Sequence, residues 1–190
     1  MLLFFLSPVW TIPFSYLLLR EKIYFQNILA AFLSVFGAFI VLWQPDLLNA
    51  KIAISDIYAI IGGIGFALTN VLARYYKDFT VKEKSYAIWI GVVLIAALVT
   101  LFFPLTLNES ILNLNNLIIL LLLGIALLVT TIVVQLGLIL VKAVKASPVF
   151  LFEIVVIGIS GYYLANEVLS LKDFVGGIFI VLGVLISARK

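Results

Sequence analysis

The sequence contains neither cysteine nor histidine, and charged residues make up only 11% of its 190 residues. Without Cys the chain has no disulfide framework and no thiolate site. Without His it lacks the commonest metal ligand and the usual general base at neutral pH. It also has no HExxH motif and no pair of carboxylates within an apolar stretch. These absences predict a protein that is not an enzyme and that uses no metal or cofactor.

Hydrophobic residues are correspondingly abundant, at 65% of the chain, whereas soluble domains carry about 45–50%. Seven stretches are each apolar enough to cross a bilayer, which takes about 20 residues of α-helix. They run over 2–19, 24–43, 56–74, 86–105, 116–141, 146–165 and 171–188. Because a backbone in lipid must satisfy its own hydrogen bonds, we expect an all-α polytopic membrane protein with seven transmembrane helices.

The basic residues lie in alternate loops between these stretches. One side collects ten of the twelve: Arg20, Lys22, Arg74, Lys77, Lys82, Lys84, Lys142, Lys145, Arg189 and Lys190. The other side has only Lys51 and Lys172. Because Lys and Arg concentrate in cytoplasmic loops, we expect a plasma (inner) membrane protein with a cytoplasmic C-terminus. The net charge of +3 is then a topology signal with membrane lipid as its partner, and no nucleic acid is expected.

A shift of 146 residues aligns the first two stretches with the last two without a gap. Glu21 then matches Glu167 and Gly37 matches Gly183. The two copies run in opposite directions across the membrane, as in transporters built from inverted repeats. We therefore expect residues 46–190 to form a complete five-helix repeat and residues 1–45 to be the last two helices of an incomplete one. By this logic three helices precede Met1 in an inverted five-plus-five arrangement.

Three local patterns resemble the EamA-type transporters of the drug/metabolite transporter superfamily. One is D-x-x-A-x-x-x-x-x-x-F-A-L-T-N-x-x-A-R, from Asp56 to Arg74. The others are a Glu at a helix end with a downstream Gly, at Glu21 and Glu167. The resemblance implies a multi-pass permease that moves a small metabolite or amino-acid-like solute by alternating access. Either a homodimer or upstream helices would complete it. The alternative is a truncated or structural membrane subunit without transport activity.

Glu153 is the one ionisable residue well inside a predicted span. An ionised carboxylate at such depth costs several kcal/mol unless it is protonated, paired or facing water. One interpretation is a substrate or proton site facing a cavity. The other is a neutral Glu that forms a hydrogen bond to a neighbouring helix.

The residue that corresponds to Glu153 in the repeat is Ser7, which begins a polar stripe with Thr11 and Ser15. Residues at this spacing share one face of a helix. If upstream helices are absent, this stripe should lie in an open groove. Trp10 adjoins the stripe and would either stack on a substrate or anchor the helix at the membrane interface. The alternative for the stripe is ordinary Ser/Thr helix packing.

Three further polar residues lie within apolar spans: Asn70, Thr131 and Gln135. Together with Glu153, Ser7, Trp10 and Thr11 they complete the predicted substrate-binding set. Buried amides and hydroxyls also join helices to one another, so packing remains the alternative. The helix-end residues Glu21 and Glu167 are either conformational latches or interfacial charges that pair with Arg20, Lys22 or Lys172.

Overall fold

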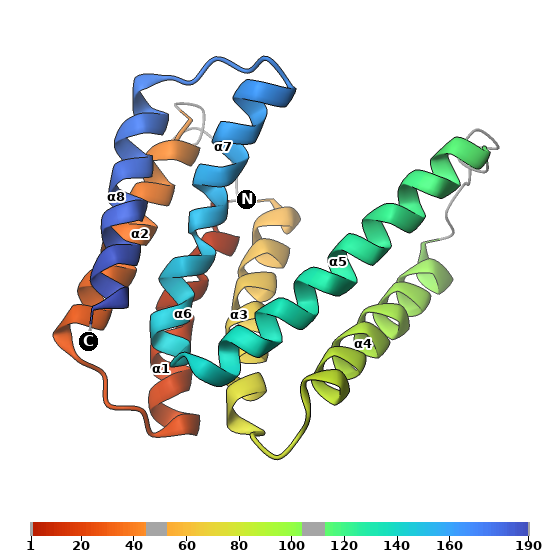
Figure 1. Ribbon diagram of the computed structural model, residues 1–190, viewed down its shortest axis with the longest axis horizontal. Helices are drawn as coiled ribbons and strands as arrows, with labels where there is room; N and C mark the ends of the chain where they lie inside the picture. Colours follow the sequence, from red (N-terminus) through yellow and green to blue (C-terminus); the bar gives the residue numbers. More distant parts are fainter. Residues whose placement is uncertain (1, 45–52, 104–112, 190) are drawn as a thin grey trace. The chain divides into compact units, whose positions relative to one another are not determined.

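The computed structural model describes residues 2–44, 53–103 and 113–189. Its regular structure is helical, and these residues contain no strand (Figure 1). In chain order the elements are η1(Phe4–Leu6), α1(Ser7–Leu19), α2(Phe25–Leu42), α3(Ile54–Tyr75), α4(Val81–Phe102), α5(Leu114–Leu140), α6(Ala143–Phe150), α7(Phe152–Leu164) and α8(Leu171–Ala188). The predicted all-α class is confirmed.

Six helical segments of the described chain are long and apolar enough to cross a membrane. They are α2, α3, α4, α5, the combined segment Ala143–Leu164, and α8. The segment Phe4–Leu19 is a shorter apolar helix. At 1.5 Å per residue it is about 24 Å long, whereas the hydrocarbon core is about 30 Å thick. The protein is therefore a multi-pass membrane protein, and the predicted count of seven spans is not confirmed.

The predicted span 146–165 begins earlier, at Ala143, and is interrupted at Leu151. Pro148 has no N–H and cannot donate to the carbonyl of Val144. The Ser147 hydroxyl donates to that carbonyl instead, at 3.2 Å. The Leu151 N–H then bonds to the Pro148 carbonyl at 3.1 Å, a three-residue spacing that belongs to a 3₁₀ turn. The helix therefore tightens for one turn before it resumes as α7.

The chain divides into two compact units. The first comprises Met1–Tyr75 with Val141–Lys190, and the second comprises Tyr76–Leu140. The first unit contains η1, α1 to α3 and α6 to α8, and the second is the hairpin of α4 and α5. This division follows packing and does not test the predicted repeats. Their boundary at residues 45 and 46 lies outside the described residues.

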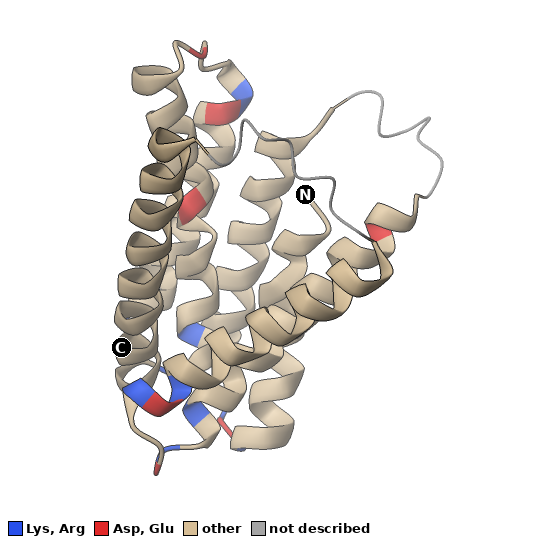
Figure 2. Ribbon diagram, turned by 90° about the vertical axis from the view of Figure 1, so that its right-hand side faces the viewer, with Lys and Arg blue, Asp and Glu red and all other residues tan. Residues whose placement is uncertain are grey.

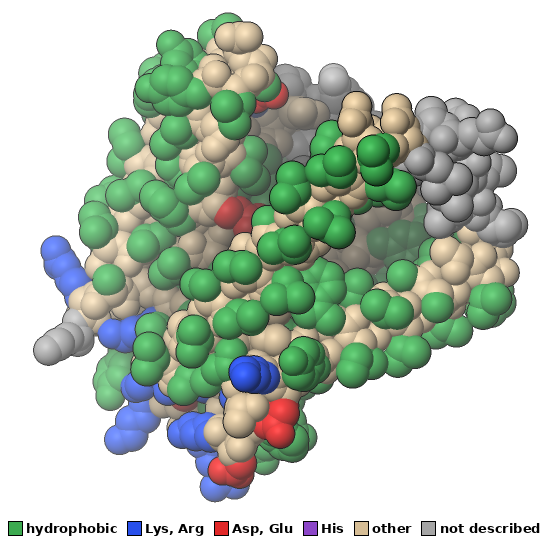
Figure 3. All heavy atoms as spheres, turned by 45° about the vertical axis from the view of Figure 1, so that its right-hand side comes forward, with side chains coloured by type: hydrophobic (Ala, Val, Ile, Leu, Met, Phe, Trp, Pro, Cys, Tyr) green, Lys and Arg blue, Asp and Glu red, His purple; other side chains and the backbone are tan. Residues whose placement is uncertain are grey.

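The α4–α5 hairpin starts at a well-formed helix cap. The Glu83 N–H donates to the Thr80 hydroxyl at 3.3 Å, and the Thr80 N–H donates to a Glu83 carboxylate oxygen at 2.7 Å. This reciprocal pair is a capping box, which satisfies two of the N–H groups left open at a helix start. Along most of α5 the side chains are apolar and exposed, as expected for a helix solvated by lipid. Hydrophobic side chains also cover much of the face shown in Figure 3.

In the first unit, α2 and α8 lie side by side and pack through small residues (Figure 1). A Cβ atom on Gly37 would lie 2.5 Å from the Gly176 carbonyl oxygen and 2.8 Å from the Ile180 amide. A Cβ atom on Gly183 would collide with the Ser34 hydroxyl. Small residues let membrane helices approach closely, where no hydrophobic effect drives them together. The core formed by Ala38, Leu151, Ile154 and Ile180 adjoins this contact.

The α1–α2 and α7–α8 hairpins match at the same shift of 146 residues. Adding 146 to the bounds of α2 gives the bounds of α8. Arg20 and Asn166, which are related by this shift, have left-handed backbone angles, with φ of 51° and 54°. In both hairpins the N–H of the following residue donates to the carbonyl six residues earlier. Glu21 donates to Ser15 at 3.3 Å, and Glu167 donates to Gly161 at 3.1 Å. Such a bond closes a helix end by satisfying an otherwise open carbonyl.

Charged residues lie mostly near the ends of helices (Figure 2). At one end of the first unit α1, α3 and α8 finish and α6 begins. This end carries most of the basic residues of the unit, and we call it the basic end. There the Lys145 ammonium donates to the Arg189 carbonyl at 2.6 Å, and the Ser187 hydroxyl donates to the Lys145 carbonyl at 2.7 Å. These bonds join the start of α6 to the end of α8.

Candidate functional site

The polar stripe of α1 is buried. Ser7, Thr11 and Ser15 have relative exposures of 3%, 1% and 0%. Their helix packs mainly against α3 and α6, so the predicted open groove is wrong. The Thr11 hydroxyl donates to the Ser7 carbonyl at 2.9 Å within its own helix. The Ser15 hydroxyl is buried and has no hydrogen-bond partner among the described residues, so it retains a free donor and acceptor.

Trp10 adjoins the stripe and is half-buried. Its indole nitrogen is buried and has no hydrogen-bond partner within the described part of the chain. A buried indole N–H ordinarily finds an acceptor. The two predicted roles of Trp10, substrate stacking and interface anchoring, are not distinguished by this arrangement.

The neighbouring helix α3 contributes Asn70, which is buried with 5% exposure. One turn earlier, the Phe66 ring packs against the rings of Phe4 and Phe150, with centroids 5.6 and 5.3 Å away. This aromatic cluster joins η1, α3 and α6. Two adjacent helices of the first unit therefore both carry buried polar side chains, and these include three of the predicted site residues, Ser7, Thr11 and Asn70.

Glu153 lies near the start of α7 with its side chain exposed. The next residue, Ile154, belongs to the hydrophobic core, whereas Glu153 itself is not part of it. Glu153 forms neither a hydrogen bond nor an ion pair with any residue that the structure describes. The interpretation as a neutral Glu bonded to a neighbouring helix therefore finds no partner in these residues.

Thr131 and Gln135 belong to α5 of the second unit. The Thr131 hydroxyl donates to the Leu127 carbonyl of its own helix at 2.8 Å. Gln135 is buried with 2% exposure, and its amide oxygen has no partner in the described chain. Gln135 therefore keeps an unused acceptor, whereas Thr131 uses its donor locally.

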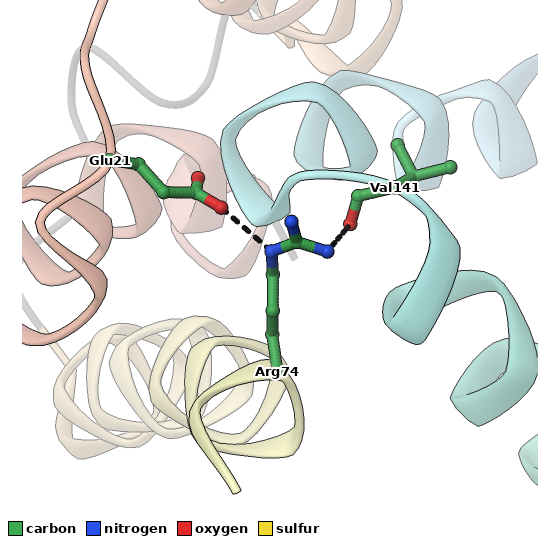
Figure 4. A network of polar contacts seen from close by, with 3 residues as sticks. All are labelled: Glu21, Arg74 and Val141. Carbon is green, nitrogen blue, oxygen red and sulfur yellow. Dashed lines mark hydrogen bonds and ion pairs between the residues drawn. The ribbon is translucent and has the colours of Figure 1, made fainter. Parts of the chain in front are cut away.

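The sequence patterns identify Arg74 as a topology charge and as the end of the Asp56–Arg74 pattern, and in the structure it forms an ion pair with Glu21. Its Nε atom lies 2.7 Å from a Glu21 carboxylate oxygen. Its Nη1 atom donates to the Val141 carbonyl at 2.8 Å (Figure 4). The two side chains are 16% and 9% exposed, so the pair is mostly shielded from water. Glu21 therefore pairs with α3 rather than with the predicted Arg20, Lys22 or Lys172.

Glu167, the residue that matches Glu21, has different surroundings. It is exposed, and its carboxylate lies against Gly161, where a Cβ atom would be 2.5 Å from the carboxylate oxygen. The predicted pairing with Lys172 is absent from the described residues. A signal for the Glu21–Arg74 pair did exist in the sequence, because Arg74 ends the Asp56–Arg74 pattern. Nothing local indicated which acidic residue it would meet.

A family model for EamA-like transporters matches residues 53–189 of this chain. The chain belongs to the EamA-like transporter family. The match covers α3 to α8, including Asn70, Arg74 and Glu153. The family resemblance inferred from the sequence patterns is confirmed. Because members of this family are transporters, the match supports a membrane transporter rather than an enzyme.

Two relatives extend the similarity to the whole chain. A protein of Clostridium kluyveri described as an uncharacterized transporter is 26% identical over 197 residues, which covers 97% of this chain and 61% of the relative. A protein of Archaeoglobus fulgidus with the same description is 27% identical over 194 residues, which covers 100% of this chain and 66% of the relative. The EamA-like chain thus spans about two thirds or less of the length of these relatives.

Proposed function

We propose that this EamA-like chain is a permease of the plasma membrane that moves a small metabolite or amino-acid-like solute by alternating access. The observation that carries the proposal is Glu153, an exposed carboxylate within the apolar segment Ala143–Leu164 that has no partner in the described chain. A carboxylate in a membrane segment is costly and ordinarily marks a substrate or ion pathway. Ser7, Trp10, Thr11, Asn70, Thr131 and Gln135 would contribute contacts to the solute.

Alternating access needs two halves that rock about a central site. In this proposal α1–α2 and α7–α8 are corresponding parts of an inverted repeat. Support comes from the contacts across α2 and α8. Gly37 meets Gly176 and Ile180, and Gly183 meets Ala30 and Ser34. Subtracting 146 from Gly176 and Ile180 gives Ala30 and Ser34, so the two sets of contacts are reciprocal.

The orientation in this proposal follows the positive-inside rule, with the basic end and the C-terminus in the cytoplasm. The bonds that join Lys145 to Arg189 and Arg74 to Val141 lie at this end. They would hold the cytoplasmic ends of α3, α6 and α8 while the other ends move. Glu153 would then lie about three turns from the cytoplasmic start of the combined segment Ala143–Leu164.

The test is exchange in liposomes that contain the purified full chain and are loaded with the twenty common amino acids. Each radiolabelled amino acid is offered outside in turn. We expect labelled uptake of at least one amino acid, and its loss in Glu153→Gln, because the amide keeps the shape but removes the charge. Glu167→Gln is the control, since this exposed carboxylate lies outside the apolar segment.

Equal uptake by Glu153→Gln and the unchanged chain would remove Glu153 from the site. Absence of exchange for every amino acid, with the helical circular dichroism signal intact, would contradict the amino-acid-like solute. It would favour the alternative of a structural subunit.

A further inference from the structure

A groove of about 350 Å³ runs between α7 and α8 of the first unit. It is lined by Val41, Ile154, Val155, Gly158, Ile159, Leu169, Asp173, Phe174, Gly177, Ile178, Val181 and Leu182. All of these residues except Asp173 are apolar or glycine. The groove therefore offers dispersion contacts along its length and almost no hydrogen bonds.

The hollow exists because two glycines leave out side chains at its walls. A Cβ atom on Gly177 would lie 3.9 Å from a Val155 methyl, and one on Gly158 would lie 3.7 Å from a Leu169 methyl. Both distances are ordinary contacts, so neither glycine is required by backbone packing. At the matching positions of the α1–α2 hairpin the chain has Ile12 and Ala31. The α1–α2 hairpin therefore carries side chains at the positions where the α7–α8 hairpin has these glycines.

The length of the groove matches one leaflet of a bilayer. On α8 it runs from Asp173, in the first turn, to Leu182. This distance along the helix is about 14 Å at 1.5 Å per residue. Half of the hydrocarbon core is about 15 Å. The groove therefore begins at the non-basic end of the unit and ends near the middle of the membrane.

The outer rim of the groove carries the features of a membrane interface. Lys172 is exposed, and its ammonium donates one bond, to the Trp43 carbonyl at 3.1 Å. An ammonium has three donors, so two remain unused among the residues that the structure describes. Asp173 is already engaged, because one of its oxygens accepts from the Ser170 N–H at 2.7 Å and from the Ser170 hydroxyl at 2.6 Å. Lys172 therefore places a cation next in sequence to Asp173, the polar residue of the groove lining.

The wall of the groove on α8 faces outward from the unit. Phe174 and Ile178 are each 59% exposed, and Leu182 is 43% exposed. Residues at this four-residue spacing form one continuous stripe along a helix. An apolar stripe on a membrane-spanning helix is solvated by lipid, so the groove opens to the bilayer.

We propose that this groove holds one acyl chain of a phospholipid from the leaflet at the non-basic end, with its phosphate at Lys172. The apolar lining, the leaflet-length run and the cation at the rim together match that molecule. The two glycines make the site by leaving room for methylene groups. The α1–α2 hairpin binds no such chain, because Ile12 and Ala31 occupy the corresponding space.

The test uses phosphatidylglycerol with a photoreactive diazirine at the end of its acyl chain, added to membranes containing the full chain. We expect the label on residues at the deep end of the groove, on α7 near Ile154 and on α8 near Leu182. Gly177→Leu should lose this label, because its side chain occupies the channel. Gly124→Leu on α5 is the matched control, since nothing lies within 4 Å of a Cβ atom there.

The proposal would be overturned if Gly177→Leu were labelled on α7 and α8 as strongly as the unchanged chain. Label spread evenly over all exposed helices of the unchanged chain would also overturn it. Gly158→Leu is the second variant if Gly177→Leu loses its helical circular dichroism signal. A stable dimer of the unchanged chain that dissociates in the folded variant would also overturn it, because a second copy would then occupy the groove.

Discussion

The α1–α2 and α7–α8 hairpins have the same turn and helix bounds that match within one residue, yet their corresponding faces have different surroundings. On α1 this face carries Ser7, Thr11 and Ser15 and is buried. On α7 the same positions are Glu153, Ile157 and Gly161, of which Glu153 and Ile157 are exposed. The difference comes from the neighbours, because α3 packs along α1 whereas α7 packs against α8.

Local sequence therefore shapes the hairpin, and tertiary packing decides what each face can do. The left-handed residue and the six-residue hydrogen bond depend only on adjacent residues, and they occur in both copies. An unpaired carboxylate is costly to bury. The buried face of α1 therefore carries neutral hydroxyl groups in place of a charged group. The carboxylate of Glu153 lies on the corresponding face of α7, which is exposed. This division would place neutral and charged contacts of one solute on different helices.

The largest effect should come from the glycines that both hairpins contribute to the α2–α8 contact. Gly37→Ala and Gly183→Ala should each lower the free energy of unfolding by about 1–3 kcal/mol, because each added Cβ atom collides with the opposite helix. Thermal unfolding in detergent, followed by tryptophan fluorescence, measures this. Gly177→Ala is the control, since its Cβ atom meets nothing closer than 3.9 Å. A large loss of stability in only one of the variants Gly37→Ala and Gly183→Ala would contradict the correspondence between the hairpins.

The next effect separates the two glutamates at the turns. Glu21→Gln should cost about 1–3 kcal/mol of stability, because it removes the carboxylate charge that lies 2.7 Å from the shielded Arg74 guanidinium. Glu167→Gln should change stability by no more than about 0.5 kcal/mol, as expected for an exposed residue without an ion pair. The same unfolding measurement applies to both. Equal losses of stability in Glu21→Gln and Glu167→Gln would show that the ion pair does not distinguish the hairpins.

The smallest effect on stability is expected at Ser15. Its buried hydroxyl has no partner in the described chain, so Ser15→Ala should leave the unfolding temperature unchanged or slightly raised. If the α1 face binds solute, labelled uptake in liposomes should nevertheless fall. Thr130→Val on α5 is the control, since that exposed hydroxyl is already bonded to the Ala126 carbonyl at 2.8 Å. Unchanged uptake would make Ser15 a packing residue.

Hydropathy located the helices closely, because the need to satisfy the backbone in lipid acts on each segment separately. The predicted stretches 24–43 and 171–188 correspond to α2 and α8 within one residue at each end. The 146-residue shift also predicted turns at Glu21 and Glu167, which the structure contains. These features depend on nearby residues, and the sequence pattern carries them.

Contacts between distant segments could not be predicted in this way. Glu21 and Arg74 are 53 residues apart, and their pairing depends on how α1 packs against α3. The burial of Ser7 and Thr11 has the same origin, and it is why the prediction of an open groove failed. The break in the helix at Leu151 could be predicted only in part. Pro148 was visible in the sequence, but the Ser147 hydroxyl that replaces the lost N–H was not singled out.

The hydrogen bond from Arg74 to the Val141 carbonyl has a mechanical consequence. The chain leaves the first unit at residues 75–76 and returns at residues 140–141. Arg74 and Val141 stand at these two crossings, and the bond fastens one to the other. The bond therefore holds together, within the first unit, the two points of the chain between which residues 76–140 are inserted.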